Sequence, residues 1–489
     1  MRKLPFVFAG LAAAAILWAN LASAAGKPPL PSGPQTDGPF RKVILDSDQQ
    51  INGRWVDTLK DPMELAVAPG GRVFYAQRDG TIKVWKPETK TTIVIAKIAV
   101  FEGLEEGMLG ITLDPSFAKN GWIYLNHSLP QTTLDAHGKK AGIIRVSRYT
   151  MVGDSLDVTS EKKILDTAVQ REQCCHVGGS LAFDSPGNLY VSVGDNTNPF
   201  DSDGYAPIDE RPGRSPWDAQ KSAANPNDLR GKINRIHTEP DGTYTIPKGN
   251  LFPPGTPGTR PEIYVMGCRN PFRISLDKKT GYLYWGEVGP DAGGPNPSRG
   301  PAGFDEVNQA RQAGNFGWPY FIADNKAYLN YDFATKVSGT PFNPLHPVNH
   351  SPNNTGAKDL PPAQPSFIAY TSGPSTKFPV VNGGGGRTAM AGPAYYFDPS
   401  LRSEHKLPKE FDHTLFIYEW SRNWIIAVHL DANERIGKME RFCDHMTFKR
   451  PMDLELGPDG CLYLIEFGTA WGNNLDSQVV RLEYAGPQT

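Results

Sequence analysis

Hydrophobic and polar residues alternate in short runs, and the same arrangement returns along the whole chain. Each copy has an apolar segment, a turn containing Asp, Pro or Gly, and a second apolar segment with a Tyr near its end. Alternation with a period of two around such a turn predicts a β-hairpin. The six copies are "MELAVAPGGRVFYAQRDG", "GMLGITLDPSFAKNGWIYLNHS", "GGSLAFDSPGNLYVSVGD", "NPFRISLDKKTGYLYWGEVG", "GPAYYFDPSLRSEHKLPKEFDHTLFIYEW" and "PMDLELGPDGCLYLIEFG".

Six similar hairpins predict an all-β chain folded as a six-bladed β-propeller, in which radial repetition protects the sheet edges. A solenoid is the rival architecture, and the irregular spacing of the copies disfavours it. The segments "RKVILDSD" (41–48) and "VVRLEYAG" (479–486) are candidates for one closing blade. We expect little helix.

Two loop-rich insertions, residues 197–262 and 323–391, interrupt the repeats and carry much of the Pro and Gly. Long insertions in a compact domain are usually functional or disordered. We expect both to form rims on one face of the propeller and to determine which substrate is accepted.

The chain begins with the pattern of a secretory signal peptide, residues 1–24. Arg2 and Lys3 precede an apolar run that ends in the cleavage signal Ala22-Ser23-Ala24. The run is short for a permanent membrane anchor, and we expect no later membrane span. A Pro/Gly-rich linker (25–40) and the propeller (41–489) would follow, in a periplasmic or secreted protein.

Charge and cysteine content exclude some partners. Lys and Arg number 50 against 52 Asp and Glu, a net charge of −2 that argues against nucleic acid. The five cysteines include no C-x-x-C-H motif, so no covalent c-type haem is expected. An oxidising compartment permits disulfides, and the odd count leaves at least one cysteine unpaired.

Polar residues gather at one end of the predicted hairpins. If each hairpin forms the two innermost strands of a blade, the residues before its first strand and after its second meet at one mouth of the central channel. A pocket with convergent titratable groups is the default active-site hypothesis. Each residue also has a structural interpretation, as a hydrogen-bonded histidine, an inter-blade ion pair or a turn residue. The group comprises Glu105, Glu106, Cys175, His176, Arg269, Asn270, Gly289, Pro290, Asp291, Ser421, Arg422, Lys449 and Arg450.

At these residues the chain resembles the glucose/sorbosone dehydrogenase family. The resemblance covers roughly residues 60–484, and its motifs occur in the family's order. It implies a six-bladed quinoprotein that uses pyrroloquinoline quinone (PQQ) and Ca²⁺ to oxidise an aldose to its lactone. Electrons would pass to a separate acceptor such as a cytochrome c. The motifs are "EEGMLGITLDPSF", "CHVGGSLAFDSPGNLYVSVGD", "CRNPFRISLD", "GFDEVNQARQAGNFGWP" and "RPMDLELGPDGCLYL".

The resemblance assigns roles to individual positions. His176 matches the general base, which takes the proton of the sugar's anomeric hydroxyl. Arg269 matches the arginine that stabilises the oxyanion of the quinone, with Asn270 beside it. Gly289 and Pro290 match backbone carbonyls that hold calcium.

Two further assignments concern charged side chains. Asp305 and Glu306 match an Asp-Glu pair, whose second member serves a separate structural calcium, with Asp324 a plausible co-ligand. Arg450 matches a cation that receives a cofactor carboxylate.

Several positions depart from the family pattern. Ser421, with Arg422 next to it, stands where a lysine binds the quinone acids, and Met452 stands where an arginine is usual. Glu105 replaces a glutamine, and Cys175 replaces the carboxylate before the histidine. These changes remove positive charge that a tricarboxylate cofactor requires. Arg387 is the first candidate to replace it, and Lys449 the second.

Adjacent cysteines suggest a further feature. Cys174 and Cys175 can close a vicinal disulfide ring, as in an unrelated quinoprotein alcohol dehydrogenase fold, and so hold His176 in place. Two separate thiols, or one bond to Cys268, are the alternatives. Cys443 and Cys461 are candidates to bridge strands of the last blade.

Two rival functions remain open from the sequence. A calcium-dependent lactonase on the same fold requires side-chain carboxylates and Asn converging on the axis. A non-catalytic propeller that binds carbohydrate or protein through its rim loops is consistent with Ser421 and Met452.

Overall fold

Strands make up nearly all the regular structure of the computed structural model, which describes residues 35–470 and 472–487. In these residues α-helix is limited to α1 (Phe117–Asn120). The expectation of an all-β chain with little helix is confirmed. Short 3-10 helices are η1 (Phe200–Ser202), η2 (Ser215–Trp217), η3 (Ala219–Lys221), η4 (Pro379–Val381) and η5 (Lys409–Phe411).

The predicted signal peptide, residues 1–24, and most of the predicted linker lie outside the described residues. The described end of that linker, from Gln35, contains β1 (Thr36–Asp37) and the first residue of β2 (Phe40–Ser47). Within the described part of the chain, no helix combines the length and the apolar composition needed to cross a membrane.

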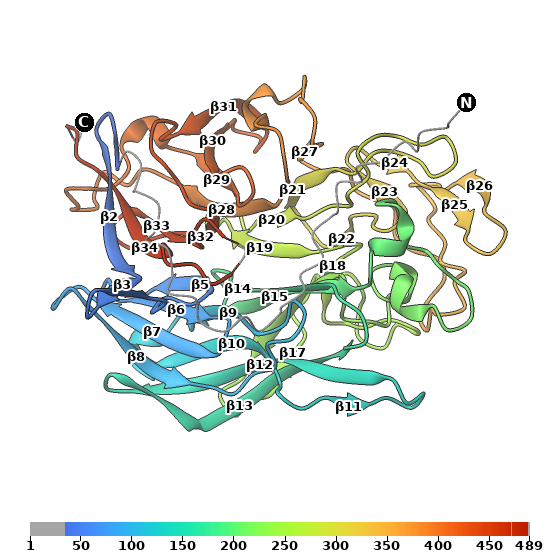
Figure 1. The fold of residues 1–489 in the computed structure, drawn as a ribbon, viewed down its shortest axis with the longest axis horizontal. Coiled ribbons are helices and arrows are strands. Elements are labelled where there is room, and N and C mark those ends of the chain that lie inside the picture. The colour runs from blue at the N-terminus through green and yellow to red at the C-terminus, as the bar shows by residue number, and fades with distance from the viewer. Residues whose placement is uncertain (1–34, 471, 488–489) are drawn as a thin grey trace, which may run out of the picture.

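Six sheets surround a common centre and form the predicted six-bladed propeller (Figure 1). Blade one contains β5 (Pro62–Val67), β6 (Val73–Gln77), β7 (Thr81–Lys86) and β8 (Thr91–Lys97). Blade two contains β9 (Met108–Leu113), β10 (Trp122–Ser128), β11 (Thr133–Leu134), β12 (Lys140–Val152) and β13 (Ser155–Gln170). Blade three contains β14 (His176–Phe183), β15 (Asn188–Asn196), β16 (Lys232–Thr238), β17 (Tyr244–Thr245), β18 (Ile263–Met266) and β22 (Gly314–Asn315).

The remaining blades follow the same plan. Blade four contains β19 (Pro271–Leu276), β20 (Leu283–Glu287), β21 (Asp305–Ala310) and β27 (Ile368–Tyr370). Blade five contains β28 (Ala389–Tyr395), β29 (Thr414–Glu419), β30 (Trp424–Leu430) and β31 (Ile436–Phe442). Blade six contains β32 (Pro451–Leu456), β33 (Leu462–Glu466) and β34 (Gln478–Tyr484), completed by β2 and β1.

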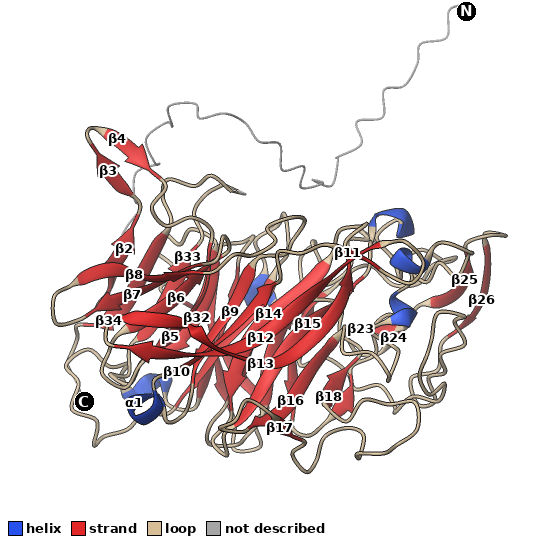
Figure 2. Ribbon diagram, turned by 90° about the horizontal axis from the view of Figure 1, so that it is seen from below, coloured by secondary structure: helices blue, strands red, loops and turns tan. Residues whose placement is uncertain are grey.

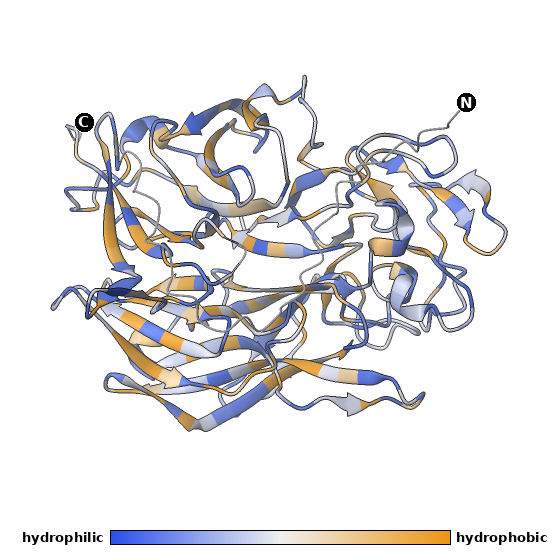
Figure 3. Cartoon of the chain, in the orientation of Figure 1, coloured by the Kyte–Doolittle hydropathy of each residue, from blue (hydrophilic) through white to orange (hydrophobic). Residues whose placement is uncertain are grey.

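Each hairpin predicted from the repeat forms the first two strands of one blade. The first strands β5, β9, β14, β19, β28 and β32 neighbour one another around the channel. Apolar and polar residues alternate along outer strands such as β13, whereas strands nearer the channel are buried on both faces (Figure 3).

The two ends of the described chain meet in blade six, as predicted. β2 pairs antiparallel with β34, from Phe40 opposite Tyr484 to Ser47 opposite Gln478. Lys42 of β2 also donates its Nζ to Oε1 of Glu466 on β33 at 2.8 Å. Both side chains are buried, so this ion pair lies inside the closing blade.

Charged side chains from neighbouring blades bond the exposed edges of the first strands in the channel. Glu64 accepts from Ile111 N at 2.7 Å, and Asp453 accepts from Leu65 N at 2.7 Å. Arg273 donates to the carbonyls of Met63 at 2.6 Å and Met452 at 3.1 Å. These contacts hold the blades together where backbone groups have no neighbouring strand.

The two insertions are smaller than predicted. β16 lies inside 197–262 as the third strand of blade three, and β27 lies inside 323–391 as the outer strand of blade four. Their flanking Gly and Pro concealed these short strands in the sequence. Outside the blades are three hairpins: β3 (Gln49–Ile51) with β4 (Arg54–Val56), β23 (Phe321–Ile322) with β24 (Lys326–Ala327), and β25 (Leu329–Asp332) with β26 (Val337–Pro341). The last of these lies beyond the blades at the edge of the molecule (Figures 1 and 2).

We expect Lys42→Ala to lower the free energy of unfolding by about 3–5 kcal/mol, because it leaves Glu466 charged, buried and without its ion-pair partner. The matched control is Lys60→Ala, because the side chains of Lys60 and its partner Glu102 are 42% and 44% exposed. An exposed pair of this kind contributes about 1 kcal/mol or less. Urea unfolding of both variants measures the difference, and equal losses would contradict a special role for the buried pair.

Candidate functional site

The loops at one end of the hairpins meet around one mouth of the channel, as the repeat predicted. Contacts link successive blades around this mouth. α1, in the turn between β9 and β10, marks the opposite mouth (Figure 2). The pairs that link successive blades are Asp195 with Arg269, Pro290 with Arg387, and Asn423 with Arg450. Two further pairs, Glu106 with Arg171 and Thr388 with Ser421, each join segments that flank a single blade.

The opposite mouth holds a cavity of about 710 Å³ that is lined by the hairpin turns. Two of its acids have structural partners: Asp184 accepts from Asn188 N at 2.7 Å, and Asp277 accepts from Lys279 N at 2.8 Å. Such bonds are ordinary turn chemistry. We therefore place the candidate site at the first mouth, where reactive groups gather.

His176, the first residue of β14, forms the centre of the site. Its imidazole is buried, and Nδ1 lies 2.8 Å from Oδ1 of Asp195 on β15. Asp195 also accepts from Nε1 of Trp318 at 2.9 Å and from Thr197 N at 3.1 Å. A carboxylate so placed accepts a hydrogen bond from Nδ1–H. It keeps the proton on Nδ1 and leaves Nε2 as the basic nitrogen.

Arg269 lies in the same cluster as His176. The carbonyl of Arg269 accepts from Asp195 N at 2.8 Å, and its guanidinium lies 6.0 Å from the ring of Trp318. Nη1 donates to Val288 O at 2.7 Å. Nε is buried and has no hydrogen-bond partner among the described residues, so one donor is left for a ligand. Asn270 faces inward as well, and its Oδ1 accepts from Gly178 N at 3.1 Å.

The vicinal disulfide is confirmed: Cys174 and Cys175 are bonded to each other, directly before His176. The peptide bond from Cys175 to His176 is cis. Glu105 lies beside both sulfurs, with ligand atoms within 4.8 Å, and its Oε2 is buried without a hydrogen-bond partner in the described chain. Disulfide sulfurs are not thiolates, so this group is a poor metal site.

The other cysteine pairings considered are wrong. Cys268, Cys443 and Cys461 are free and buried, so neither a bond to Cys268 nor a bridge in blade six forms. Burial raises the pKa of each of these three thiols, which keeps them protonated.

Three buried carboxylates fix the mouth loops, and sequence reasoning missed them. Each ends the second strand of its blade and accepts from the backbone before the first strand. Glu287 accepts from the amides of Arg269 and Asn270, Glu419 from that of Thr388, and Glu466 from that of Lys449. The signal was the acid in "WGEVG", "IYEWS" and "LIEFG" at one position of the repeat. Burial raises the pKa of Glu287 to about 8.

Arg387 reaches across the mouth to blade four. Its Nη2 donates to Pro290 O at 2.7 Å, Nη1 donates to Gly303 O, and Nε lies 3.6 Å from Oδ1 of Asp305. The Pro290 carbonyl expected to hold calcium therefore accepts hydrogen bonds from a guanidinium. Gly289 N, next to it, donates to Asp305 Oδ1 at 3.1 Å.

Ser421 and Arg422 lie at the mouth with structural partners. Ser421 Oγ lies 2.8 Å from the hydroxyl of Thr388. The three guanidinium nitrogens of Arg422 donate to carbonyls of residues 386, 381 and 371 at 2.8–3.0 Å. Arg422 therefore fixes the glycine-rich loop before blade five and has little capacity for a cofactor carboxylate.

The cations of blade six differ in position. Lys449 Nζ lies 3.4 Å from Asp476 Oδ2, so the Asp476 carboxylate compensates most of the charge of Lys449. Arg450 lies 4.2 Å from the ring centre of Trp420 and is half-buried. Met452 is part of the hydrophobic core. Asp476 acts on the charge of Arg450 as well.

The two acids expected to hold a structural calcium have protein partners instead. Both oxygens of Glu306 are engaged, one by Asn308 at 3.0 Å and one by the amide of Ala323. Asp324 is 64% exposed and lies 3.8 Å from Lys326. Burial raises the pKa of Glu306 to about 7, with added repulsion from Asp305 and Asp324.

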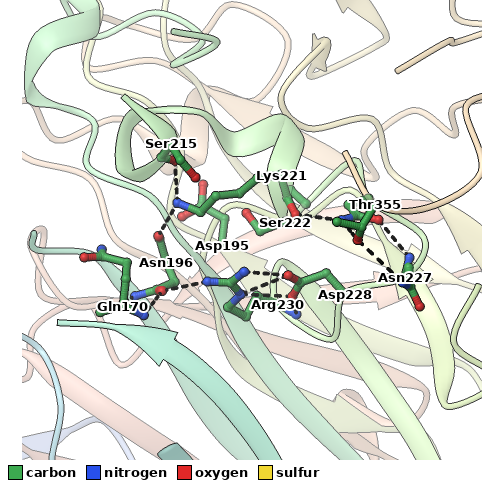
Figure 4. Close-up of polar contacts among 12 residues, drawn as sticks. Gln170, Asp195, Asn196, Ser215, Lys221, Ser222, Asn227, Asp228, Arg230 and Thr355 are labelled. Atoms are coloured by element: carbon green, nitrogen blue, oxygen red, sulfur yellow. Dashed lines mark hydrogen bonds and ion pairs between the residues drawn. The ribbon is translucent and has the colours of Figure 1, made fainter. Parts of the chain in front are cut away.

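A second polar network supports the end of β15 at Asn196, which pairs with His176 across the two strands (Figure 4). Arg230 Nη1 donates to Asn196 Oδ1 at 3.0 Å. Lys221 Nζ donates to Ser215 O at 2.7 Å and to Asn196 O at 3.3 Å. Burial lowers the pKa of Lys221 to about 7. This network fixes the backbone that carries Asp195.

We expect the stability of the protein to fall between pH 5 and pH 8. The pKa of Glu287 is about 8 in the folded state against 4.5 for an ordinary Glu, so the folded state holds the extra proton in this window. Unfolding releases that proton and becomes easier as the pH rises. Glu287→Gln keeps a carbonyl acceptor and flattens the slope, whereas the exposed Glu88→Gln leaves it unchanged. Thermal unfolding across this pH range measures the slopes, and equal slopes for wild type and Glu287→Gln would contradict the assignment.

Known proteins resemble this chain in sequence and in fold. Quinoprotein glucose dehydrogenase B of Acinetobacter calcoaceticus is 26% identical over 316 residues, 62% of this chain and 60% of that protein. Hedgehog-interacting protein of Mus musculus is 26% identical over 235 residues, 45% of this chain and 31% of that protein. The PQQ-bound aldose sugar dehydrogenase of Streptomyces coelicolor has a TM-score of 0.54 at 17% identity, covering 92% of this chain and 99% of that one.

The chain spans about 60% of the length of the curated bacterial relatives to which it is similar. The family described as Glucose / Sorbosone dehydrogenase matches residues 59–351. This match covers more than half of the 489 residues, and it includes the His176 and Arg269 loops. The protein therefore belongs to the glucose/sorbosone dehydrogenase family.

Proposed function

We propose that the protein is a quinoprotein sugar dehydrogenase, which oxidises an aldose or a related sugar hydroxyl to the lactone. One observation carries the proposal: His176 and Arg269 share the neighbours Asp195 and Trp318 at the mouth of the propeller. Asp195 fixes His176 Nδ1 and accepts from Trp318, whose ring lies 6.0 Å from the Arg269 guanidinium. A base and an adjacent fixed cation are the groups that such an oxidation requires.

The residues at the mouth suit an anionic cofactor such as PQQ. Arg269 Nε is a buried donor without a hydrogen-bond partner among the described residues, and a quinone oxygen is a matching acceptor. Arg450 would receive a carboxylate, and Asn270 and the Cys175 sulfur would line the site. When bound, PQQ supplies the acceptor for the hydride of the sugar.

The protein's own groups then handle charge and protons. Asp195 holds His176 with Nε2 unprotonated, so Nε2 can take the proton of the anomeric hydroxyl. Trp318 Nε1 and Thr197 N also donate to Asp195 and hold its carboxylate against the imidazole. Arg269 places positive charge where negative charge develops on oxygen.

Calcium does not fit the position expected for it. Pro290 O, one of its two predicted ligands, accepts from Arg387, and the predicted Glu306 site has both carboxylate oxygens engaged. We assign no step to a metal ion. The location of the protein in the periplasm or outside the cell, and a separate acceptor such as a cytochrome c, complete the proposal on the sequence evidence.

We expect His176→Ala to lower kcat by about 10²–10⁴-fold, because it removes the general base. Asp195→Asn should lower kcat as well, since it disturbs the imidazole tautomer, while the Kd of PQQ stays within about twofold. Dye reduction by protein mixed with PQQ and an aldose measures turnover, and absorbance titration measures binding.

The matched control is His405→Ala, which removes an imidazole that is 31% exposed beside Glu483, far from this mouth. Its kcat should equal that of the wild type. Turnover retained by His176→Ala with cofactor bound would remove His176 from its role.

We also expect reduction of the Cys174–Cys175 disulfide to lower kcat by about 10–100-fold, because a small displacement of the base is costly. Reoxidation should restore turnover. A double variant, Cys174→Ala with Cys175→Ala, provides the control, since reductant cannot alter it. Thiol titration verifies reduction, and unchanged turnover after complete reduction would show that the ring does not position His176.

A non-catalytic binding protein is the second candidate. Two observations favour it: the similarity to Hedgehog-interacting protein, and Ser421 and Met452 where relatives have cations. Sugar binding without PQQ binding in the same titrations would decide for it. A lactonase is less suited to this mouth, because Glu287 and Glu419 hold backbone amides; lactone hydrolysis without quinone would reinstate it.

A further inference from the structure

We propose that the Arg387 guanidinium takes the place of a calcium ion at this mouth, so that the chain binds its cofactor without calcium. The cofactor half of this inference rests on the proposed function. The other half, that the oxygens around Arg387 form a cation site already filled by a side chain, rests on the structure alone.

Three oxygen groups converge on Arg387. Nη2 donates to Pro290 O at 2.7 Å, Nη1 donates to Gly303 O, and Nε lies 3.6 Å from Asp305 Oδ1. The Arg387 side chain is 6% exposed and that of Asp305 is 1% exposed. Two backbone carbonyls and a carboxylate are the hard oxygen ligands that calcium prefers.

Close backbone packing brings these oxygens together. A Cβ on Gly303 would lie 1.7 Å from Pro290 O, and a Cβ on Gly289 would lie 1.6 Å from Phe304 O. The segments after β20 and before β21 therefore approach as only glycine allows. The cluster is a rigid consequence of blade four and does not depend on the side chain that fills it.

The loop before blade five holds the guanidinium in this cluster. Thr388, next in sequence, donates its hydroxyl to Arg387 O and its amide to Glu419. Arg422 Nε donates to Gly386 O at 3.0 Å on the other side. Arg387 is therefore fixed from both neighbours before any ligand arrives, and little entropy is lost when a ligand binds.

Charge makes the guanidinium and a metal ion mutually exclusive here. A calcium ion bound to Pro290 O at the usual 2.3–2.6 Å would lie within about 5 Å of Arg387, with no more than the charge of Asp305 between them. Repulsion between two cations at such a distance, in a buried site, strongly disfavours binding of the metal ion. The Arg387–Asp305 pair leaves the cluster neutral and supplies a donor face where a metal would supply a Lewis acid.

Calorimetric titration of EGTA-treated protein with Ca²⁺ tests the structural half. Wild type should show no site at this mouth, and Arg387→Ala should gain one site, because two carbonyls and the Asp305 carboxylate become available. Arg387→Met keeps the side-chain volume and should gain the same site if the alanine variant folds poorly. The matched control is Arg311→Ala, which removes an exposed arginine that also donates to two carbonyls, those of Asn433 and Glu434. It should gain no site.

Titration with PQQ in calcium and in EGTA tests the cofactor half. The Kd of wild type should change less than twofold between the two buffers, whereas that of Arg387→Met should improve tenfold or more with calcium. A wild type that needs calcium to bind PQQ, or a variant that gains no calcium site, overturns the inference. PQQ that binds under no condition refutes the proposed function, while the calcium titration still decides what fills the site.

Discussion

The unpaired edges of the innermost strands are the constraint on which this propeller depends. A strand that lines the channel pairs with another strand on one side only. Its N–H and C=O groups that face the channel therefore need other partners. Glu64, Arg273 and Asp453 supply them across blade boundaries. Because each of these side chains bonds the backbone of a different blade, the first strands of blades one, two, four and six are held in register with one another.

At the mouth, too, buried charged side chains bond backbone groups that have no strand partner. Glu287, Glu419 and Glu466 end the second strands and bond the amides of the loops that lead into the first strands. Most charged groups at the mouth therefore have a structural task. Among the described residues at the mouth, the groups left for chemistry are the His176 imidazole and the unpaired donor of Arg269, whereas the Arg387 guanidinium is engaged by Pro290, Gly303 and Asp305.

The hairpin repeat was readable because turn residues and period-two alternation are local signals, and the mouth followed from it by geometry. The channel cluster was missed, although "PME", "PFR" and "PMD" place Glu64, Arg273 and Asp453 at one position of three repeats. The partners of His176 were not predictable. Asp195 lies one strand away, but Trp318 lies 123 residues further along the chain, in the loop after β22, and no local pattern indicates that contact. Arg422 was misleading for a related reason: its sequence position is at the mouth, while its guanidinium donates to loop carbonyls.

The propeller is closed by pairing β2, near the start of the described chain, with β34 near its end. This pairing constrains the order in which the blades can be completed. The sheet that includes β2 cannot be finished until β34 exists, at the far end of the chain. Until then one edge of β33 has no partner strand. Blade six is then incomplete and cannot fully cover the hydrophobic sides of blades one and five. Contacts between residues so far apart in the sequence form slowly. Hydrophobic surface and unpaired strand edges stay exposed until they form, and such surfaces favour aggregation. Maturation of this protein is therefore a whole-chain event, in which truncation of either end costs the entire toroid and not one blade.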